Sequence, residues 1–123
     1  MGLDMWLYTE GDGGNEQLAY WRKANQIRAF FASYVPEKVG ENIDRLTVTL
    51  DMLNTLEEKV DKCLKARDMQ VSKQLLPTSS GFFFGCTDYD NYYYDELERT
   101  KDIIQAARRE ITNGHSVIYT EWW

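Results

Sequence analysis

The feature that most constrains the fold is a long amphipathic segment in the last third of the chain. Its buried positions recur at steps of three or four over about five turns, which is the spacing of one helix face. The members of this stripe are Tyr93, Leu97, Thr100, Ile104, Ala107 and Ile111. Thr87 or Asp88 can cap the start, and Asn113-Gly114 is typical of a helix end. We predict a helix from about residue 88 to 112 that buries its stripe against another layer.

Alternation between two faces predicts strands at both ends of the chain. In residues 3–9, Leu3 and Met5 fall on one side together with Leu7, while Trp6 and Tyr8 fall on the other. Residues 116–122 are predicted to form the last strand. The first and last strands are expected to pair with each other.

Two more helices are predicted between these strands. Apolar residues three or four apart predict a helix from residue 17 or 21 to 34. Another helix is predicted from residue 50, with Thr49 as its cap, to a point before Pro77. Phe82-Phe83-Phe84 lies between two glycines and predicts a short buried strand or extended segment.

The order of these elements predicts the fold class. A length of 123 residues suits a single domain over 1–123, and a hydrophobic content of 43% is enough for a buried core. Strands at both ends with helices between them indicate an α+β fold. We expect a small, mostly antiparallel sheet with three main helices packed on it.

Charge and targeting signals exclude several classes of protein. The chain has 14 Lys and Arg against 20 Asp and Glu, a net charge of −6, whereas nucleic-acid binders need a basic face to neutralise phosphates. No apolar run approaches the roughly 20 residues that span a bilayer, and the start of the chain lacks a secretion signal. We expect a cytoplasmic protein that binds neither nucleic acid nor membrane directly.

Signatures of metal, cofactor and catalytic sites are weak. Cys63 and Cys86 form no CxxC motif and are expected to be reduced thiols. The two cysteines and the lone His115 do not have the spacing of metal ligands. A nucleophilic Cys86–His115 pair would need the fold to bring distant residues together. We therefore expect no metal, no cofactor and no catalysis. An enzyme acting on nucleotides stays open as a third class of function, because Arg, Lys and carboxylates can serve phosphoryl chemistry.

The segment Tyr20–Ile27 combines aromatic rings with cations and amides. Cations near aromatic planes can hold a flat anionic ligand, since charge binds a phosphate while a ring stacks on a base. The predicted ligand-binding residues here are Trp21, Arg22, Lys23, Asn25 and Gln26. The alternative is that the tryptophan packs in the core and that the cations are solvated or pair with carboxylates.

The segment Leu76–Asp90 contains a phenylalanine run next to several hydroxyls. Backbone amides at the start of the following helix can receive an anion, although Asp88 and Asp90 already place negative charge there. The predicted ligand-binding residues are Ser80, Gly81, Phe82, Phe84 and Thr87. The alternative is a tight turn, a hydrophobic strand and a capped helix. Ligand binding requires both segments to line one open hollow.

Aromatic residues also crowd the start of the long helix and the end of the chain. The tyrosines cannot all face the core, because consecutive helical residues point about 100° apart. Exposed aromatic area is typical of a protein interface, which includes contacts between copies in a homo-oligomer. The predicted interface residues are Tyr89, Tyr92, Tyr94, Asp95 and Trp123. The alternative is partial burial at the sheet edge.

Four segments in order over most of the chain form a specific combination. They are Met1–Met5, Tyr20–Ile27, Leu76–Gly85 and Asp88–Tyr93. Together they resemble a group of small proteins encoded by phages and prophages, in which His is common at the position of Arg28 and Ser at that of Cys86. Small accessory phage proteins often counter bacterial immunity, so the resemblance implies an anti-defence role in the infected host.

Two functions are predicted from these observations. The first is non-enzymatic sequestration of a small anionic, nucleotide-like signalling molecule in a pocket lined by both motifs. The second is inhibition of a host defence protein, such as a nuclease, by an acidic decoy similar to an anti-CRISPR protein. In the second case the surface around Asp88–Asp102 would occupy a basic groove of the partner.

Overall fold

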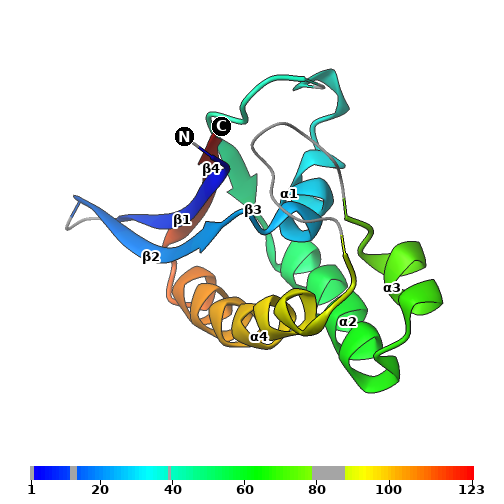
Figure 1. Cartoon of the computed structure of the whole chain (residues 1–123). Helices are drawn as coiled ribbons and strands as arrows, with labels where there is room; N and C mark the ends of the chain where they lie inside the picture. Colours follow the sequence, from blue (N-terminus) through cyan, green and yellow to red (C-terminus); the bar gives the residue numbers. More distant parts are fainter. Residues whose placement is uncertain (1, 12–13, 39, 79–87) are drawn as a thin grey trace.

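The computed structural model describes residues 2–11, 14–38, 40–78 and 88–123. Its centre is a four-stranded antiparallel sheet with the strand order β2-β1-β4-β3 (Figure 1). The strands are β1 (Asp4–Gly11), β2 (Gly14–Arg22), β3 (Leu46–Val48) and β4 (Ser116–Trp122). The first and last strands lie side by side, with Asp4 opposite Trp122, so their predicted pairing is confirmed.

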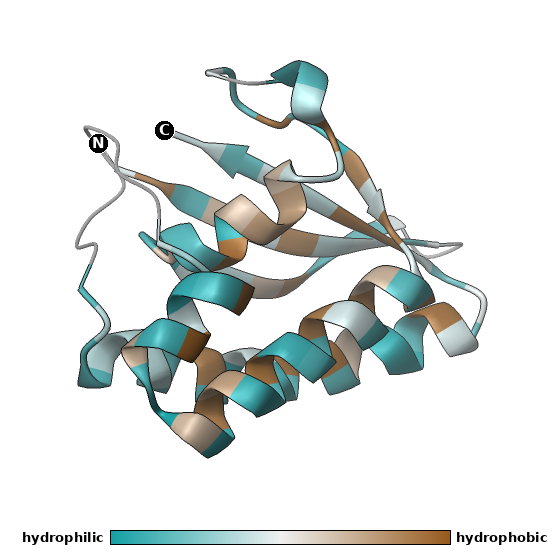
Figure 2. Cartoon of the chain, turned by 90° about the vertical axis from the view of Figure 1, so that its right-hand side faces the viewer, coloured by the Kyte–Doolittle hydropathy of each residue, from teal (hydrophilic) through white to brown (hydrophobic). Residues whose placement is uncertain are grey.

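The α-helices within the described residues all lie on one side of the sheet (Figures 1 and 2). They are α1 (Asn25–Ala32), α2 (Leu50–Ala66), α3 (Met69–Leu75) and α4 (Asn91–Thr112). A short 3-10 helix, η1 (Pro36–Lys38), lies in the connection to β3. This arrangement confirms the predicted α+β fold with an antiparallel sheet.

The predicted start of the first helix is wrong. The chain forms strand β2 along residues 14–22, paired with β1, and the helix begins only at Asn25. Trp21 and Ala24 are both buried and lie three residues apart, but the first is the penultimate residue of a strand and the second precedes a helix. Buried residues that belong to two successive elements can therefore have the same spacing in the sequence as residues on one face of a single helix.

The other predicted boundaries are partly correct. Thr49 caps α2 as expected, because its hydroxyl accepts a hydrogen bond from the backbone N–H of Met52 at 3.2 Å. The chain then breaks at Arg67, whose φ is 45°, and Asp68 caps the separate helix α3. Strand β3 was not predicted, and the phenylalanine run at 82–84 lies outside the described residues.

Large aromatic side chains fill the space between the sheet and the helices. Trp21, Phe31 and Tyr119 are each at most 1% exposed, and the Phe31 ring stacks on the Tyr119 ring with centroids 4.4 Å apart. The Trp21 indole Nε1–H donates to the Thr100 hydroxyl of α4 at 3.1 Å. This hydrogen bond satisfies the polar atom of the indole and joins β2 to α4 inside the core.

A buried carboxylate holds the end of β4 against α1 and the η1 connection. Glu121 is 3% exposed and accepts hydrogen bonds from Arg28, the Ile43 backbone, Tyr119 and Trp123 at 2.7–3.1 Å. Burial, and then the Glu121 charge, raise the pKa of Tyr119 well above its ordinary value, so its hydroxyl keeps the proton that it donates. The carboxylate is therefore paired and fully hydrogen-bonded, as a buried charge must be.

We predict that Arg28→Ala lowers the free energy of unfolding by about 3–5 kcal/mol, because it leaves the Glu121 carboxylate buried without its cation. Urea denaturation near neutral pH measures this loss. Lys62→Ala is the matched control, since it removes an exposed ion pair with Glu58 and should cost less than about 1 kcal/mol. Equal losses in the two variants would contradict a structural role for the buried pair.

Candidate functional site

Described residues of the two sequence motifs meet at one place in the fold. Lys23 and Gln26 come from the first motif, while Thr78 and Asp88 come from the second, and all four line a small hollow with residues from the start of α4. The further lining residues are Asp90, Tyr92 and Tyr93. The hollow measures about 10 Å³, which is close to the space that one water molecule needs. We call this place the motif junction.

The backbone at Lys23 has an unusual conformation for a residue with a side chain. Its φ is +57°, in the left-handed region, and its N–H donates to the Leu3 carbonyl at 2.7 Å. The chain must turn there, because β2 ends at Arg22 and α1 begins at Asn25. Strain of this kind persists where the surrounding contacts fix the backbone, and the turn places Lys23 at the wall of the junction.

The charges at the motif junction do not favour a bare anion. Lys23 shares the hollow with the carboxylates of Asp88 and Asp90. Asp90 also caps α4, because its side chain accepts from the Tyr93 backbone N–H at 3.1 Å. The two aspartates therefore offset the lysine in the described part of this site.

The remaining residues of the first motif are divided between the core and the surface. The prediction that Trp21 binds a ligand is wrong, because an indole that is 1% exposed has no face open to a ligand. Arg22 is exposed. Asn25 and Gln26 are buried, and the Gln26 amide donates to the Tyr93 carbonyl at 3.4 Å.

The predicted ligand-binding residues outside the described part of the chain are Ser80, Gly81, Phe82, Phe84 and Thr87.

The predicted interface residues also separate into two groups. Tyr92 is 55% exposed and Asp95 is exposed, as an interface requires. The prediction that Tyr94 lies at an interface is wrong, because Tyr94 is 6% exposed and its hydroxyl lies 2.9 Å from that of Ser72 in the core. Exposed aromatic area thus exists at the start of α4, but only part of the tyrosine cluster supplies it.

The two other aromatic interface candidates have partners within the fold. Tyr89 is half-buried, and its hydroxyl accepts from the Thr78 backbone N–H at 3.0 Å. Trp123 is half-buried, and its indole donates to Glu121 at 3.1 Å. Trp122, which was not among the predicted interface residues, is 63% exposed. The aromatic surface at the end of the chain therefore comes from Trp122.

A partly buried carboxylate lies beside the motif junction on α4. Glu96 has a buried oxygen without a hydrogen-bond partner, and its nearest cation is Arg99 at 3.6 Å. Burial raises the pKa of Glu96, and the Arg99 charge offsets this only in part. The Arg99 guanidinium also donates to the backbone carbonyl of Tyr20, so it reaches from α4 to strand β2.

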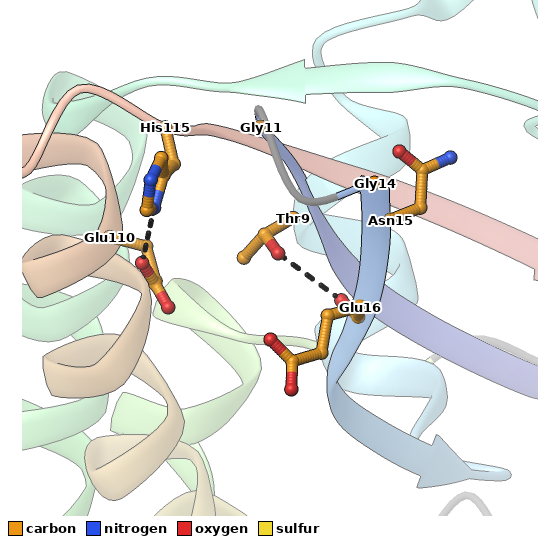
Figure 3. Close-up of a pocket in the computed structure, with 7 residues that line it drawn as sticks. All are labelled: Thr9, Gly11, Gly14, Asn15, Glu16, Glu110 and His115. Atoms are coloured by element: carbon orange, nitrogen blue, oxygen red, sulfur yellow. Dashed lines mark hydrogen bonds and ion pairs between the residues drawn. The ribbon is translucent and has the colours of Figure 1, made fainter.

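A larger hollow than the motif junction was not predicted from the sequence. It has a volume of about 430 Å³ and lies between the β1–β2 hairpin and the end of α4 (Figure 3). Its lining residues are Thr9, Gly11, Gly14, Asn15, Glu16, Glu110 and His115. We call it the hairpin hollow. The glycines near residue 11 gave a signal for a turn, but nothing in the sequence linked that turn to Glu110 and His115.

Other kinds of site are not found in the described residues. No group of three His, Cys, Asp or Glu side chains there could hold a metal ion. None of the helices described combines the length and the apolar character needed to cross a membrane. Comparison with protein-family models, with curated proteins and with solved structures finds no match for the chain.

We predict that Lys23→Gly is more stable than Lys23→Ala by about 1 kcal/mol, because glycine adopts a positive φ without the clash of a Cβ atom. Thermal or urea unfolding of the two variants measures the difference. The neighbouring strand position supplies the control, since Arg22→Ala should be more stable there than Arg22→Gly. A more stable alanine variant at both positions would argue against strain at Lys23.

We also predict a pH dependence for Glu96→Gln. The folded state holds the Glu96 proton more tightly than the unfolded state, so the contribution of this group to stability is present at low pH and is lost as pH rises above about 4.5. The free energy of unfolding of the variant, minus that of the wild type, should therefore increase between about pH 4 and pH 7. Urea denaturation across this range, with exposed Glu98→Gln as the control, tests the sign. A difference that falls with pH would contradict it.

Proposed function

We propose that this chain is a non-enzymatic, phage-encoded binding protein that antagonises a bacterial defence by occupying a basic surface of a host protein. The observation that carries this proposal is the acidic and aromatic surface on the outside of α4. Tyr92, Asp95 and Asp102 are exposed there. The phage origin and the anti-defence role in the host cytoplasm rest on the resemblance of the sequence motifs.

The spacing of these residues places them together. Tyr92 and Asp95 are three residues apart, as are Asp95 and Glu98, and Asp102 follows Glu98 by four, so they lie along one side of the helix. Glu98 pairs with Arg67, whereas no ion pair of Asp95 or Asp102 is found among the described residues. An exposed ring beside unneutralised carboxylates is a surface that suits Arg and Lys of a partner.

The ion pairs elsewhere on the molecule strengthen this argument. On the side of α4 that faces α2, Lys101 pairs with Asp61 and Arg108 pairs with Glu57. Each such pair cancels one charge of either sign, so the net charge of −6 remains on groups outside the pairs. A net negative field of this kind speeds association with a basic partner and weakens with salt.

Sequestration of an anionic, nucleotide-like molecule is the second candidate. The meeting of both motifs at the motif junction favours it. The burial of Trp21 and the presence of Asp88 and Asp90 give this function less support from the described residues. Calorimetry with a panel of nucleotide signals would support it only if binding occurs and Arg22→Ala weakens it.

We predict that the double variant Asp95→Lys/Asp102→Lys loses its host partner in a pull-down from bacterial lysate. Reversal of both charges turns an attractive surface into a repulsive one, so capture should fall by at least about tenfold. With the wild-type chain, the captured protein should be released as NaCl rises from about 0.1 M to about 0.5 M. Added DNA should also displace the chain from a partner that uses a nucleic-acid groove.

The matched control is Glu37→Lys/Asp44→Lys, which changes the net charge equally at exposed positions between α1 and β3. This control should retain at least half of the capture. Equal loss in both double variants would show only a general charge effect, and retention in both would remove α4 as the binding surface.

A further inference from the structure

The hairpin hollow has the size and the walls of a small-molecule site. Its volume of about 430 Å³ falls within the range of roughly 300–1,000 Å³ that ligand pockets occupy. The side chains of Thr9, Glu16 and Glu110 converge on it from β1, β2 and α4 (Figure 3). Thr9 is 7% exposed, so its position on the wall is fixed by packing. The site is therefore built by three elements that come from different parts of the chain.

The walls of this hollow offer mainly hydrogen-bond acceptors. His115 Nδ1 lies 2.8 Å from a carboxylate oxygen of Glu110. Glu110 has a second oxygen, and no partner of the Glu16 carboxylate is found among the described residues. An acceptor-rich wall suits a ligand with several N–H donors.

The charged groups around the hollow are mainly carboxylates. Glu16 and Glu110 are both negative, and no Lys or Arg is among the described residues that line it. α4 ends at Thr112, so the carbonyl end of the helix dipole adds partial negative charge on this side. Arg108 and Arg109 near this end line a different hollow, with Gln105, Thr112 and Asn113. Anions are therefore disfavoured here, and a cation is favoured.

We propose that the hairpin hollow binds an organic cation that carries a guanidinium or primary ammonium group. The donors of such a group match the carboxylates of Glu16 and Glu110. A metal ion fits less well, because the described residues hold no group of three ligating side chains. This inference is independent of the proposed function, since it rests on the hollow and not on the surface of α4.

The test is a titration of the full-length chain, labelled with ¹⁵N, with agmatine, which carries both a guanidinium and an ammonium group. Saturable shifts are expected at Thr9, Asn15, Glu110 and His115, with little change at Asp95 and Asp102. Spermidine and the amide of N-acetyl-arginine are the further probes. The first represents a free polyamine and the second a side chain of a basic protein, and the tighter of the two identifies the source of the cation. N-butylurea is the neutral control, and it should not bind.

Two variants locate the site. Glu16→Gln should weaken agmatine binding at least tenfold, whereas Glu37→Gln, an exposed change on η1, should leave it unchanged. Gly11→Ala offers an independent check, because its Cβ would lie 3.0 Å from the His115 ring and would displace it. Shifts spread evenly over all acidic residues, equal binding of butylurea, or equal weakening by Glu37→Gln would overturn the proposal.

Discussion

The burial of Trp21 is the constraint on which both the core and the motif junction depend. Its indole donates to Thr100, which fixes β2 against α4. Strand geometry then turns the next side chain, Arg22, outward, and the chain has to reverse before α1 begins. Lys23 makes this reversal with a left-handed backbone, and it lines the junction together with Asp90. A residue that resembled a ligand-stacking ring in the sequence therefore acts by positioning its neighbours.

The parts of the fold that the sequence predicts are those in which one element carries its own complete pattern. The stripe of α4 continues for the whole helix, and the alternation in β1 places Met5 and Leu7 inside. Prediction fails where one pattern crosses two elements, as it does between Trp21 and Ala24. It also fails for β3, because three residues are too few to show a period. The number of residues over which the apolar period repeats, rather than the preference of each residue for helix or strand, decides which elements can be predicted.

The sites were harder to predict than the fold because their charges come from distant segments. The sequence showed that Lys23 is a cation beside aromatic residues, but it did not show that Asp88 and Asp90 share its hollow. The hairpin hollow depends on Glu16 and Glu110, which are separated by most of the chain. Nothing local marks such a pair, since each carboxylate alone has the pattern of a solvated surface residue. The pairing of β1 with both β2 and β4, together with the direction of α4, brings them together.

Helix α4 separates the proposed binding surfaces along the molecule. The motif junction lies at its beginning, near Tyr92, and the acidic surface runs from Tyr92 to Asp102, while the hairpin hollow lies at its end, near Glu110. At 1.5 Å per residue, Tyr92 lies about 27 Å from Glu110 along the helix and Asp102 about 12 Å, and both distances exceed the Debye length of about 8 Å at physiological salt. Charge changes at one end therefore have little direct effect on the other. A partner protein on the outer surface and a small cation in the hollow can bind at the same time, because a rigid helix holds the two places apart.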